Sequence, residues 1–203
     1  MTTASKEPLT RADADEIETR ILDAALVQFE KVGVKKTTIE DVAKQAGVDR
    51  VTVYRRVGSR DDLVAAVVGR EVGLVLAELA DMPERHDDFG DLVADVFVTV
   101  ITRWRTHGLV ERLLAVEPER ILVKLTVDGA TTFAMSVAAA VEVFERAARR
   151  GLFAAPADLA TRVEIGCRVV HSLILVQGGL AELASEAELA EFARAYLVPI
   201  IPG

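Results

Sequence analysis

Gly47 lies between two short amphipathic segments, and it constrains the fold of the chain more than any other residue. The segment TIEDVAKQA before it and the segment DRVTVYRRV after it both have helical patterns, and Asp49 is a suitable N-cap for the second. Glycine can adopt the left-handed conformation that a sharp turn between helices requires. Apolar residues occur where the two helices must pack: Val42, Ala46, Val48 and Val53. The pattern predicts a helix-turn-helix.

A further amphipathic helix is predicted before this pair. From Ile17 to Val32 apolar residues recur at steps of three and four, and Gly33 supplies a C-terminal stop. Residues 1–15 are polar and show no periodicity, so they are predicted to form a flexible tail.

Two capping patterns predict where the next helices begin. Thr37 and Glu40 have the spacing of a capping box at the start of the second helix. Ser59, with Asp62 three residues on, can cap a fourth helix over residues 60–80.

The remainder of the sequence also has helical periodicity, without the alternating pattern of strands. Helices are predicted over residues 88–107, 109–127 (one or two, broken by Pro118), 130–150, 156–183 and 186–200. The fold class is therefore all-α, with a tail over 1–15, a three-helix helix-turn-helix domain over 16–62 and a larger helical domain over 63–203.

Charge is distributed unevenly along the chain. The formal net charge is −8, yet residues 31–60 carry eight basic and three acidic side chains. Residues 71–203 carry 12 basic and 20 acidic side chains. This asymmetry predicts a basic working surface on an acidic body.

The cellular context is predicted from what the sequence lacks. Cys167 is the single cysteine, so no disulfide can form within the chain. The N-terminus has no apolar stretch typical of a secretory signal, and the most apolar runs are too short for a membrane helix. A cytoplasmic protein without membrane contact is expected.

Residues 37–63, TTIEDVAKQAGVDRVTVYRRVGSRDDL, closely resemble the DNA-binding segment of the TetR family of bacterial transcriptional regulators. The family's first-helix pattern is matched by Ile21, Ala24, Ala25, Phe29 and Gly33. The resemblance covers about the first quarter of the chain. It implies a homodimeric regulator, usually a repressor, whose partners are a double-stranded DNA operator and a small-molecule effector, with no cofactor.

The resemblance also implies DNA-contact roles for individual positions. Tyr54, Thr38 and Arg60 match phosphate-contacting positions, and Thr52 matches a position that touches backbone or base. Because arginine can bind guanine bidentately, Arg50 and Arg55 are predicted to read bases. Two further residues join this predicted face: Val51, which is left exposed by the packing, and Arg56, whose target is either base or phosphate. The alternatives for these positions are solvated arginines, a capping role for Thr38 and a rim role for Tyr54.

The sequence departs from the family pattern at the end of the recognition helix. The family usually has an aromatic residue where Val57 stands and frequently has proline where Gly58 stands. An altered geometry is expected at this junction.

Candidate effector contacts are large or semi-polar residues on otherwise apolar helices: Phe97, Trp104, His107, Phe133, Met135, Cys167 and His171. Ordinary core is the alternative for each. Cys167 and His171 share a helix face but have no evident third ligand, so no metal site is predicted. An apolar or amphipathic organic effector is expected.

The two C-terminal stripes predict a four-helix dimer seam with a symmetry mate. Its predicted members are Val170, Leu173, Ile174, Gln177, Leu189, Phe192 and Tyr196. Burial within one chain is the alternative.

The sequence contains no G-x-S-x-G, no phosphate-binding G-x-x-x-x-G-K-[ST] and no H-E-x-x-H, so an enzyme is not predicted. The alternative function is a helical protein that binds a small molecule or a partner without specific DNA binding.

Overall fold

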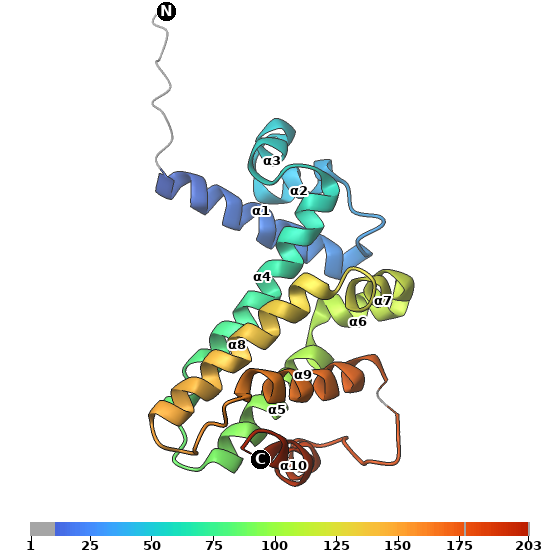
Figure 1. The fold of residues 1–203 in the computed structure, drawn as a ribbon. Coiled ribbons are helices and arrows are strands. Elements are labelled where there is room, and N and C mark those ends of the chain that lie inside the picture. The colour runs from blue at the N-terminus through green and yellow to red at the C-terminus, as the bar shows by residue number, and fades with distance from the viewer. Residues whose placement is uncertain (1–10, 177, 203) are drawn as a thin grey trace, which may run out of the picture. The chain divides into compact units, whose positions relative to one another are not determined.

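The computed structural model describes residues 11–176 and 178–202, and every regular element in these ranges is a helix (Figure 1). The all-α fold class is therefore confirmed. The chain divides into two compact units, the first ending at Arg70 and the second beginning at Glu71. The division lies within α4 (Arg60–Ala80), eight residues beyond the domain boundary expected from the sequence.

The first unit contains α1 (Arg11–Val32), α2 (Ile39–Ala46), α3 (Arg50–Val57) and the first half of α4. Because α1 begins at Arg11, the predicted tail is wrong for residues 11–15, while residues 1–10 lie outside the described ranges. Asp13 in the first turn favours this earlier start, since negative charge stabilises a helix N-terminus.

The core of this unit follows the helical period. Ile21, Ala25 and Phe29 of α1, spaced four apart, are at most 1% exposed. They belong to a buried set with Val42 of α2, Val53 of α3, and Leu63 and Val67 of α4. Burial of each large aliphatic or aromatic side chain contributes about 1.5–3 kcal/mol, so this set accounts for much of what holds four short elements together.

The turn between α2 and α3 has the geometry expected of it. Gly47 has φ +65° and ψ +37°, in the left-handed region, and its N–H donates to the carbonyls of Ala43 and Lys44. The neighbouring Ala46 carbonyl accepts a hydrogen bond from Nη2 of Arg20 at 2.5 Å. The helix-turn-helix is thereby tied to α1.

The capping box of α2 lies one residue later than predicted. Thr38 is the N-cap: its backbone N–H donates to Oδ2 of Asp41 at 3.0 Å, and its hydroxyl accepts from the Asp41 N–H at 3.2 Å. The predicted partner Thr37 is buried instead, and its hydroxyl donates to the Gly33 carbonyl at 2.9 Å. At α4 the predicted cap is confirmed, since Ser59 N–H donates to Oδ2 of Asp62 at 2.8 Å and Asp62 N–H donates to the Ser59 hydroxyl at 3.2 Å.

The second unit begins with the remainder of α4 and a 3₁₀ turn (Met82–Glu84). It continues with α5 (Phe89–Thr106), α6 (Gly108–Val116), α7 (Pro118–Leu125), α8 (Ala130–Arg149), α9 (Leu159–Leu175) and α10 (Glu186–Phe192). A π turn (Ala193–Leu197) and a 3₁₀ turn (Val198–Ile200) follow α10. The predicted break at Pro118 is confirmed.

The ninth helix is shorter than the sequence predicts. It ends at Leu175 rather than at residue 183, and Val176 is extended with φ −129° and ψ 103°. Gly178 and Gly179 come shortly after, and glycine has low helix propensity, so continuation of the helix is disfavoured.

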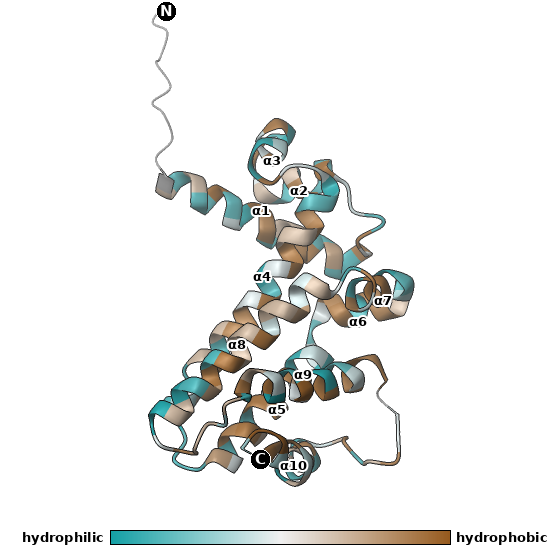
Figure 2. Ribbon diagram, viewed as in Figure 1, coloured by the Kyte–Doolittle hydropathy of each residue, from teal (hydrophilic) through white to brown (hydrophobic). Residues whose placement is uncertain are grey.

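Helix α5 is the centre of the second core and is strongly apolar (Figure 2). Leu92, Val93, Phe97 and Ile101 lie along its buried side and are at most 3% exposed. The helix contacts α9, α10 and the C-terminal turns. The apolar side of α5 is therefore the surface against which most of the second unit packs.

In the described ranges, none of the helices is by itself long and apolar enough to cross a membrane. The pair α7 and α8 passes such a test only when taken together, and the two are bent by 58° at their break.

Gly58 is expected to be essential to the join between α3 and α4. Its φ is +94°, and a Cβ there would lie 2.6 Å from Oδ2 of Asp62. We expect Gly58→Ala to lower the free energy of unfolding by about 1–3 kcal/mol, because it combines backbone strain with a disrupted cap. Urea denaturation followed by circular dichroism measures this.

Gly69→Ala is the matched control. Gly69 is helical and a Cβ there would meet nothing within 4 Å, so the gain in helix propensity should stabilise by about 1 kcal/mol. Changes of the same sign in both variants would contradict the role given to Gly58.

Candidate nucleic-acid interface and ligand cavity

The exposed face of α3 carries most of the predicted DNA contacts. Val51 is 72% exposed and Tyr54 is 43% exposed, and the side chains of Arg50 and Arg55 are exposed beside them. Thr52 is half-buried, and its N–H donates to Oδ1 of the N-cap Asp49 at 2.6 Å. The short helix thus presents two arginines, a tyrosine and an apolar group together.

Arg50 and Tyr54 interact one helical turn apart. Nη2 of Arg50 donates to the Tyr54 hydroxyl at 3.3 Å, and its guanidinium carbon lies 5.3 Å from the ring centroid. The hydrogen bond that Arg50 donates to the Tyr54 hydroxyl raises the pKa of Arg50, so its positive charge is retained. This pair holds the arginine along the exposed face of α3.

Thr38 is engaged in its own cap. Its hydroxyl donates to Oδ2 of Asp41 at 2.6 Å. The side-chain and backbone hydrogen bonds from Thr38 lower the pKa of Asp41. The capping role, an alternative considered for this residue, is therefore the one seen in the unbound structure.

Arg60 is oriented inward. The sequence predicts that its side chain is free to bind a phosphate, whereas in the structure the side chain bonds to backbone carbonyls. Its Nε donates to the Thr37 carbonyl at 3.1 Å and its Nη2 donates to the Val34 carbonyl. The side chain is partly buried and connects the start of α4 to the turn before α2. The cause is geometric: two otherwise unused carbonyls of that turn match the fork of donors on a guanidinium.

Arg56 differs from the exposed arginines on either side of α3. It is half-buried, and its Nε is fully buried without a hydrogen-bond partner among the residues that the structure describes. This side chain lies against its own unit rather than on the exposed face.

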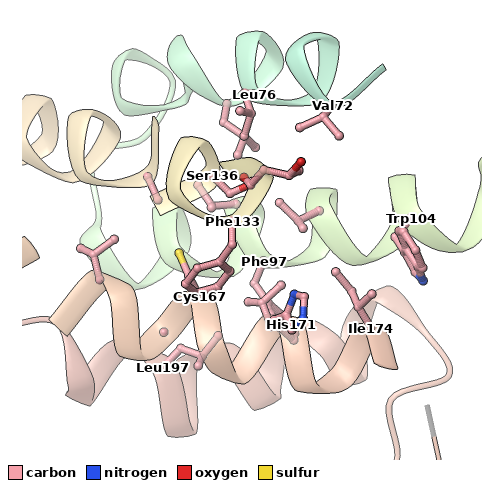
Figure 3. A pocket seen from close by; sticks show the side chains of 18 of the residues that line it. Val72, Leu76, Phe97, Trp104, Phe133, Ser136, Cys167, His171, Ile174 and Leu197 are labelled. Carbon is pink, nitrogen blue, oxygen red and sulfur yellow. The ribbon is translucent and has the colours of Figure 1, made fainter. Parts of the chain in front are cut away.

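The second unit contains a cavity of about 230 Å³ (Figure 3). Its walls come from α4, α5, the end of α7, α8, α9 and the C-terminal turns. Five predicted effector contacts line it: Phe97, Trp104, Phe133, Cys167 and His171. Helices widely separated in the sequence therefore bring most of these candidates together.

Two predicted effector contacts, His107 and Met135, do not line the cavity. His107 caps α6, with its Nδ1 accepting the Leu109 N–H at 3.2 Å and its Nε2 3.2 Å from Oε2 of Glu71. Because Nδ1 is an acceptor, the ring proton is assigned to Nε2, which donates to the carboxylate. Met135 is 49% exposed, on another side of α8.

The predicted dimer residues mostly face their own unit. Val170 and Ile174 line the cavity, Leu173 packs against the core, and Leu189 is 2% exposed. Because it is buried in its own chain, Leu189 is not available to contact a second copy, and its predicted place in the interface is wrong. Burial within one chain, the alternative left open for these stripes, explains this set.

The remaining predicted interface residues differ from one another. Phe192 stacks on Phe97 with ring centroids 5.7 Å apart, and Tyr196 packs against Phe192 at 5.0 Å. Tyr196 is nevertheless 63% exposed. Gln177 lies outside the described residues.

The polar groups of the cavity are few. Thr132, Ser136, Cys167 and His171 line it together with Lys124 and Trp104, and Nε1 of Trp104 is buried without a hydrogen-bond partner among the described residues. Burial raises the pKa of the Cys167 thiol to about 11, so the thiol is neutral at physiological pH. The described residues contain no group of three or more side chains suited to hold a metal ion.

Sequence reasoning missed the contribution of α4 to this cavity. Val72, Leu76 and Leu79 line it (Figure 3 labels Val72 and Leu76). Their spacing of four and three is a helical stripe, and this was the available signal. It also missed the inward bonds of Arg60, which no periodicity reveals.

Comparison with known proteins agrees with this geometry. The model of the bacterial regulatory proteins of the tetR family matches residues 21–67, which span the helix-turn-helix and the start of α4. The N-terminal part of the chain is therefore similar to the DNA-binding domain of TetR-family regulators.

The curated relatives of this chain are transcriptional regulators, and the chain matches only part of each. TtgR of Pseudomonas putida, an HTH-type transcriptional regulator, is 31% identical over 109 residues, covering 51% of this chain and 52% of TtgR. SrpR of the same species is 39% identical over 59 residues, covering 29% and 28%. The chain spans about half the length of the first relatives it matches.

Solved structures of TetR-family repressors share the fold of this chain over most of its length. The repressor AlkX from Dietzia sp. has a TM-score of 0.67 at 20% identity, covering 91% of this chain and 96% of AlkX. SmeT, the repressor of a multidrug efflux pump of Stenotrophomonas maltophilia, has a TM-score of 0.58 at 20% identity, covering 90% and 88%. At this identity the likeness is one of fold.

Replacement of Arg60 by lysine should affect stability. Lysine cannot reproduce the two simultaneous bonds to the Val34 and Thr37 carbonyls, so Arg60→Lys should lower the free energy of unfolding by about 2 kcal/mol. Urea denaturation measures the change. The exposed Arg55→Lys is the matched control and should remain within about 0.5 kcal/mol of the unmodified protein. An unchanged midpoint for Arg60→Lys would contradict the inward role.

The cap of α2 should weaken in acid. Because the pKa of Asp41 is lowered in the folded chain, its stabilising contribution is fully present above the unfolded value of about 3.9 and is lost as pH falls through the folded value. Thr38→Ala removes the hydroxyl and should raise the pKa of Asp41 in an NMR titration.

Thr19→Ala serves as the control for this titration. The Thr19 hydroxyl donates to the Asp15 carbonyl on exposed α1, away from the cap. If both variants leave the Asp41 titration unchanged, the cap does not control it.

Proposed function

We propose that this protein is a ligand-responsive transcriptional repressor. In this proposal it binds a pseudo-palindromic DNA operator as a homodimer and releases it when a small, largely apolar molecule occupies the cavity. The observation that carries the proposal is the exposed face of α3, where Arg50, Val51, Tyr54 and Arg55 stand on a helix preceded by a glycine turn.

The residues of α3 suit different parts of DNA. A helix of this size fits the major groove with its N-terminal residues at the base edges. Arg50 and Arg55 can bind O6 and N7 of guanine, while the exposed Val51 can contact a thymine methyl group. The Tyr54 hydroxyl suits a phosphate, and Thr38 and Thr52 border the same surface. Arg56 and Arg60 are proposed to attract DNA through their positive charge rather than to contact bases or phosphates directly.

Two copies of α3 are needed to read a useful length of DNA, because eight residues span few base pairs. A two-fold axis would place the copies one helical turn apart, about 34–36 Å on the operator. Exposed apolar side chains on the last helices support an interface there: Ile165, Val176 and Tyr196 are 46%, 63% and 63% exposed. We include these residues in the proposed dimer contact.

Helix α4 is proposed to couple ligand and DNA. Its second half supplies Val72, Leu76 and Leu79 to the cavity, and its first half supplies Leu63 and Val67 to the core beneath α3. A ligand shifts the population only if it binds one arrangement more tightly than the other. Release follows when the preferred arrangement no longer matches the operator spacing.

The named relatives are transcriptional regulators rather than enzymes, and we propose no enzymatic activity and no cofactor for this chain. Its proposed place of action is the cytoplasm, where a bacterial operator is found.

Selection of bound DNA from a random pool tests the proposal, with recovery of a palindrome as the expected result. On that palindrome, Arg50→Ala should relax the preference at one base pair by about 1–3 kcal/mol. Tyr54→Phe should weaken every sequence, because it removes a phosphate contact, and should also relax part of the Arg50 preference, because it removes the hydrogen bond that Arg50 donates to the Tyr54 hydroxyl. Fluorescence anisotropy over a salt series measures both.

The unmodified protein and Thr19→Ala, which lies away from α3, are the controls for these titrations. Equal, weak binding to all sequences would instead favour a helical protein that binds a small molecule or a partner without DNA specificity.

A further inference from the structure

We infer that the cavity takes a neutral molecule about the size of one substituted ring, with a single polar group placed at His171. The inference rests on the proposed function, because it specifies the chemical class of the ligand that the regulator senses. Its four supports are the size of the cavity, the charge of its lining, the free ring of His171 and the aromatic walls.

The size of the cavity limits the ligand. A dry apolar cavity of about 150 Å³ is enough for benzene, and drug-sized ligands occupy about 300–1,000 Å³. At about 230 Å³, this cavity is large enough for a ring with a short substituent and smaller than the pockets that hold drug-sized ligands.

The charge of the lining argues for a neutral ligand. Among the described residues that line the cavity, Lys124 is the single charged one. Its side chain is 50% exposed and its Nζ lies 3.1 Å from Oδ2 of Asp128, so its charge is already paired at the surface. An ion in an apolar cavity without a partner loses its hydration uncompensated.

The arginines near Trp104 in the sequence have other partners. Arg103 donates to both carboxylate oxygens of Glu78 at 2.8 Å, and Arg105 donates to the Leu183 carbonyl at 2.5 Å. Neither lines the cavity. An anionic ligand would therefore find only Lys124 as a counter-charge, and Lys124 is already paired with Asp128.

His171 is the polar group best placed for a ligand. It points from α9 into the cavity (Figure 3), and its ring nitrogens make no hydrogen bond with the described residues. The Ser136 hydroxyl, by contrast, already donates to the Thr132 carbonyl at 3.0 Å. A neutral imidazole has one donor and one acceptor, so it suits a hydroxyl group on the ligand.

Aromatic groups surround the place where a ring would lie. Phe133 meets His171 edge to face with centroids 5.6 Å apart, and Phe97 and Trp104 supply further aromatic surface from α5. Trp104 is also the single tryptophan of the chain, so its fluorescence reports this cavity alone.

The test is a Trp104 fluorescence titration of the full chain with three probes of similar shape: 4-ethylphenol, ethylbenzene and 4-ethylbenzoate. At neutral pH we expect 4-ethylphenol to bind and the benzoate to bind at least about a hundredfold more weakly, because its charge stays unpaired. Comparable binding of phenol and benzoate, or no binding of any probe, would overturn the inference.

His171→Phe keeps a ring but removes the polar partner. We expect 4-ethylphenol to bind about fivefold more weakly, the effect of one ordinary hydrogen bond, and ethylbenzene to bind no more weakly than before. An equal loss for both probes would show a packing role for His171 and overturn its assignment.

Gly166→Leu tests whether the probes enter this cavity. Gly166 lines it, and a Cβ there would meet nothing within 4 Å, so a leucine side chain would fill the space. Gly73→Leu is the matched control, since Gly73 is helical, equally open and not part of the lining. Binding should fall tenfold or more in the first variant alone, and unchanged binding there would overturn the location. The probe ranking on the unmodified chain stands even if a variant does not fold.

Operator affinity measured beside the titration separates the two proposals. If the operator is bound and no probe binds, the ligand class is wrong while DNA reading stands. If 4-ethylphenol binds and operator affinity does not change, the ligand class stands and the ligand-responsive part of the proposed function is wrong.

Discussion

The contact of Arg60 with the carbonyls of Val34 and Thr37 determines how the first unit is assembled. It joins the first residue of α4 to the turn that precedes α2, two places separated by more than twenty residues. Since α3 lies between them in the chain, its two ends are held by this contact and by the Gly47 turn. A recognition helix of eight residues has little stability of its own, because short helices depend on tertiary packing. Its orientation is therefore a property of the elements around it.

Much of the helical architecture could be predicted from the sequence, because helix periodicity, Pro118 and the caps are local signals. The errors are also local in origin. Thr37 and Thr38 are both competent caps with an acidic residue three positions on, and burial of Thr37 decides between them. The end of α9 at Leu175 was missed because the apolar period was followed past Gly178 and Gly179, whose low helix propensity is the local signal for a stop.

For the candidate site, the sequence indicated which residues are unusual but not which other residues surround them. A stripe shows which face of a helix is apolar but not what covers it, and Val170 and Ile174, which the sequence predicts for a dimer seam, also line the cavity. His107 has the polarity of a ligand contact, yet its ring caps α6. Phe97, Phe133 and Cys167 were identified because large or polarisable groups are scarce on these helices. Their meeting in one cavity depends on how α5, α8 and α9 pack, which is long-range information.

The positive φ of Gly58 has a consequence for engineering by family consensus. Consensus substitution is commonly stabilising because it restores the residue that most relatives favour. Proline, which the family frequently has at this position, is confined to φ near −65° and cannot donate the N–H that Gly58 gives to the Tyr54 carbonyl at 3.0 Å. The backbone conformation of Gly58 is therefore one that proline cannot adopt. A chimera that transplants a foreign α3 into this scaffold needs to carry the Gly58–Ser59 junction of the host, not that of the donor.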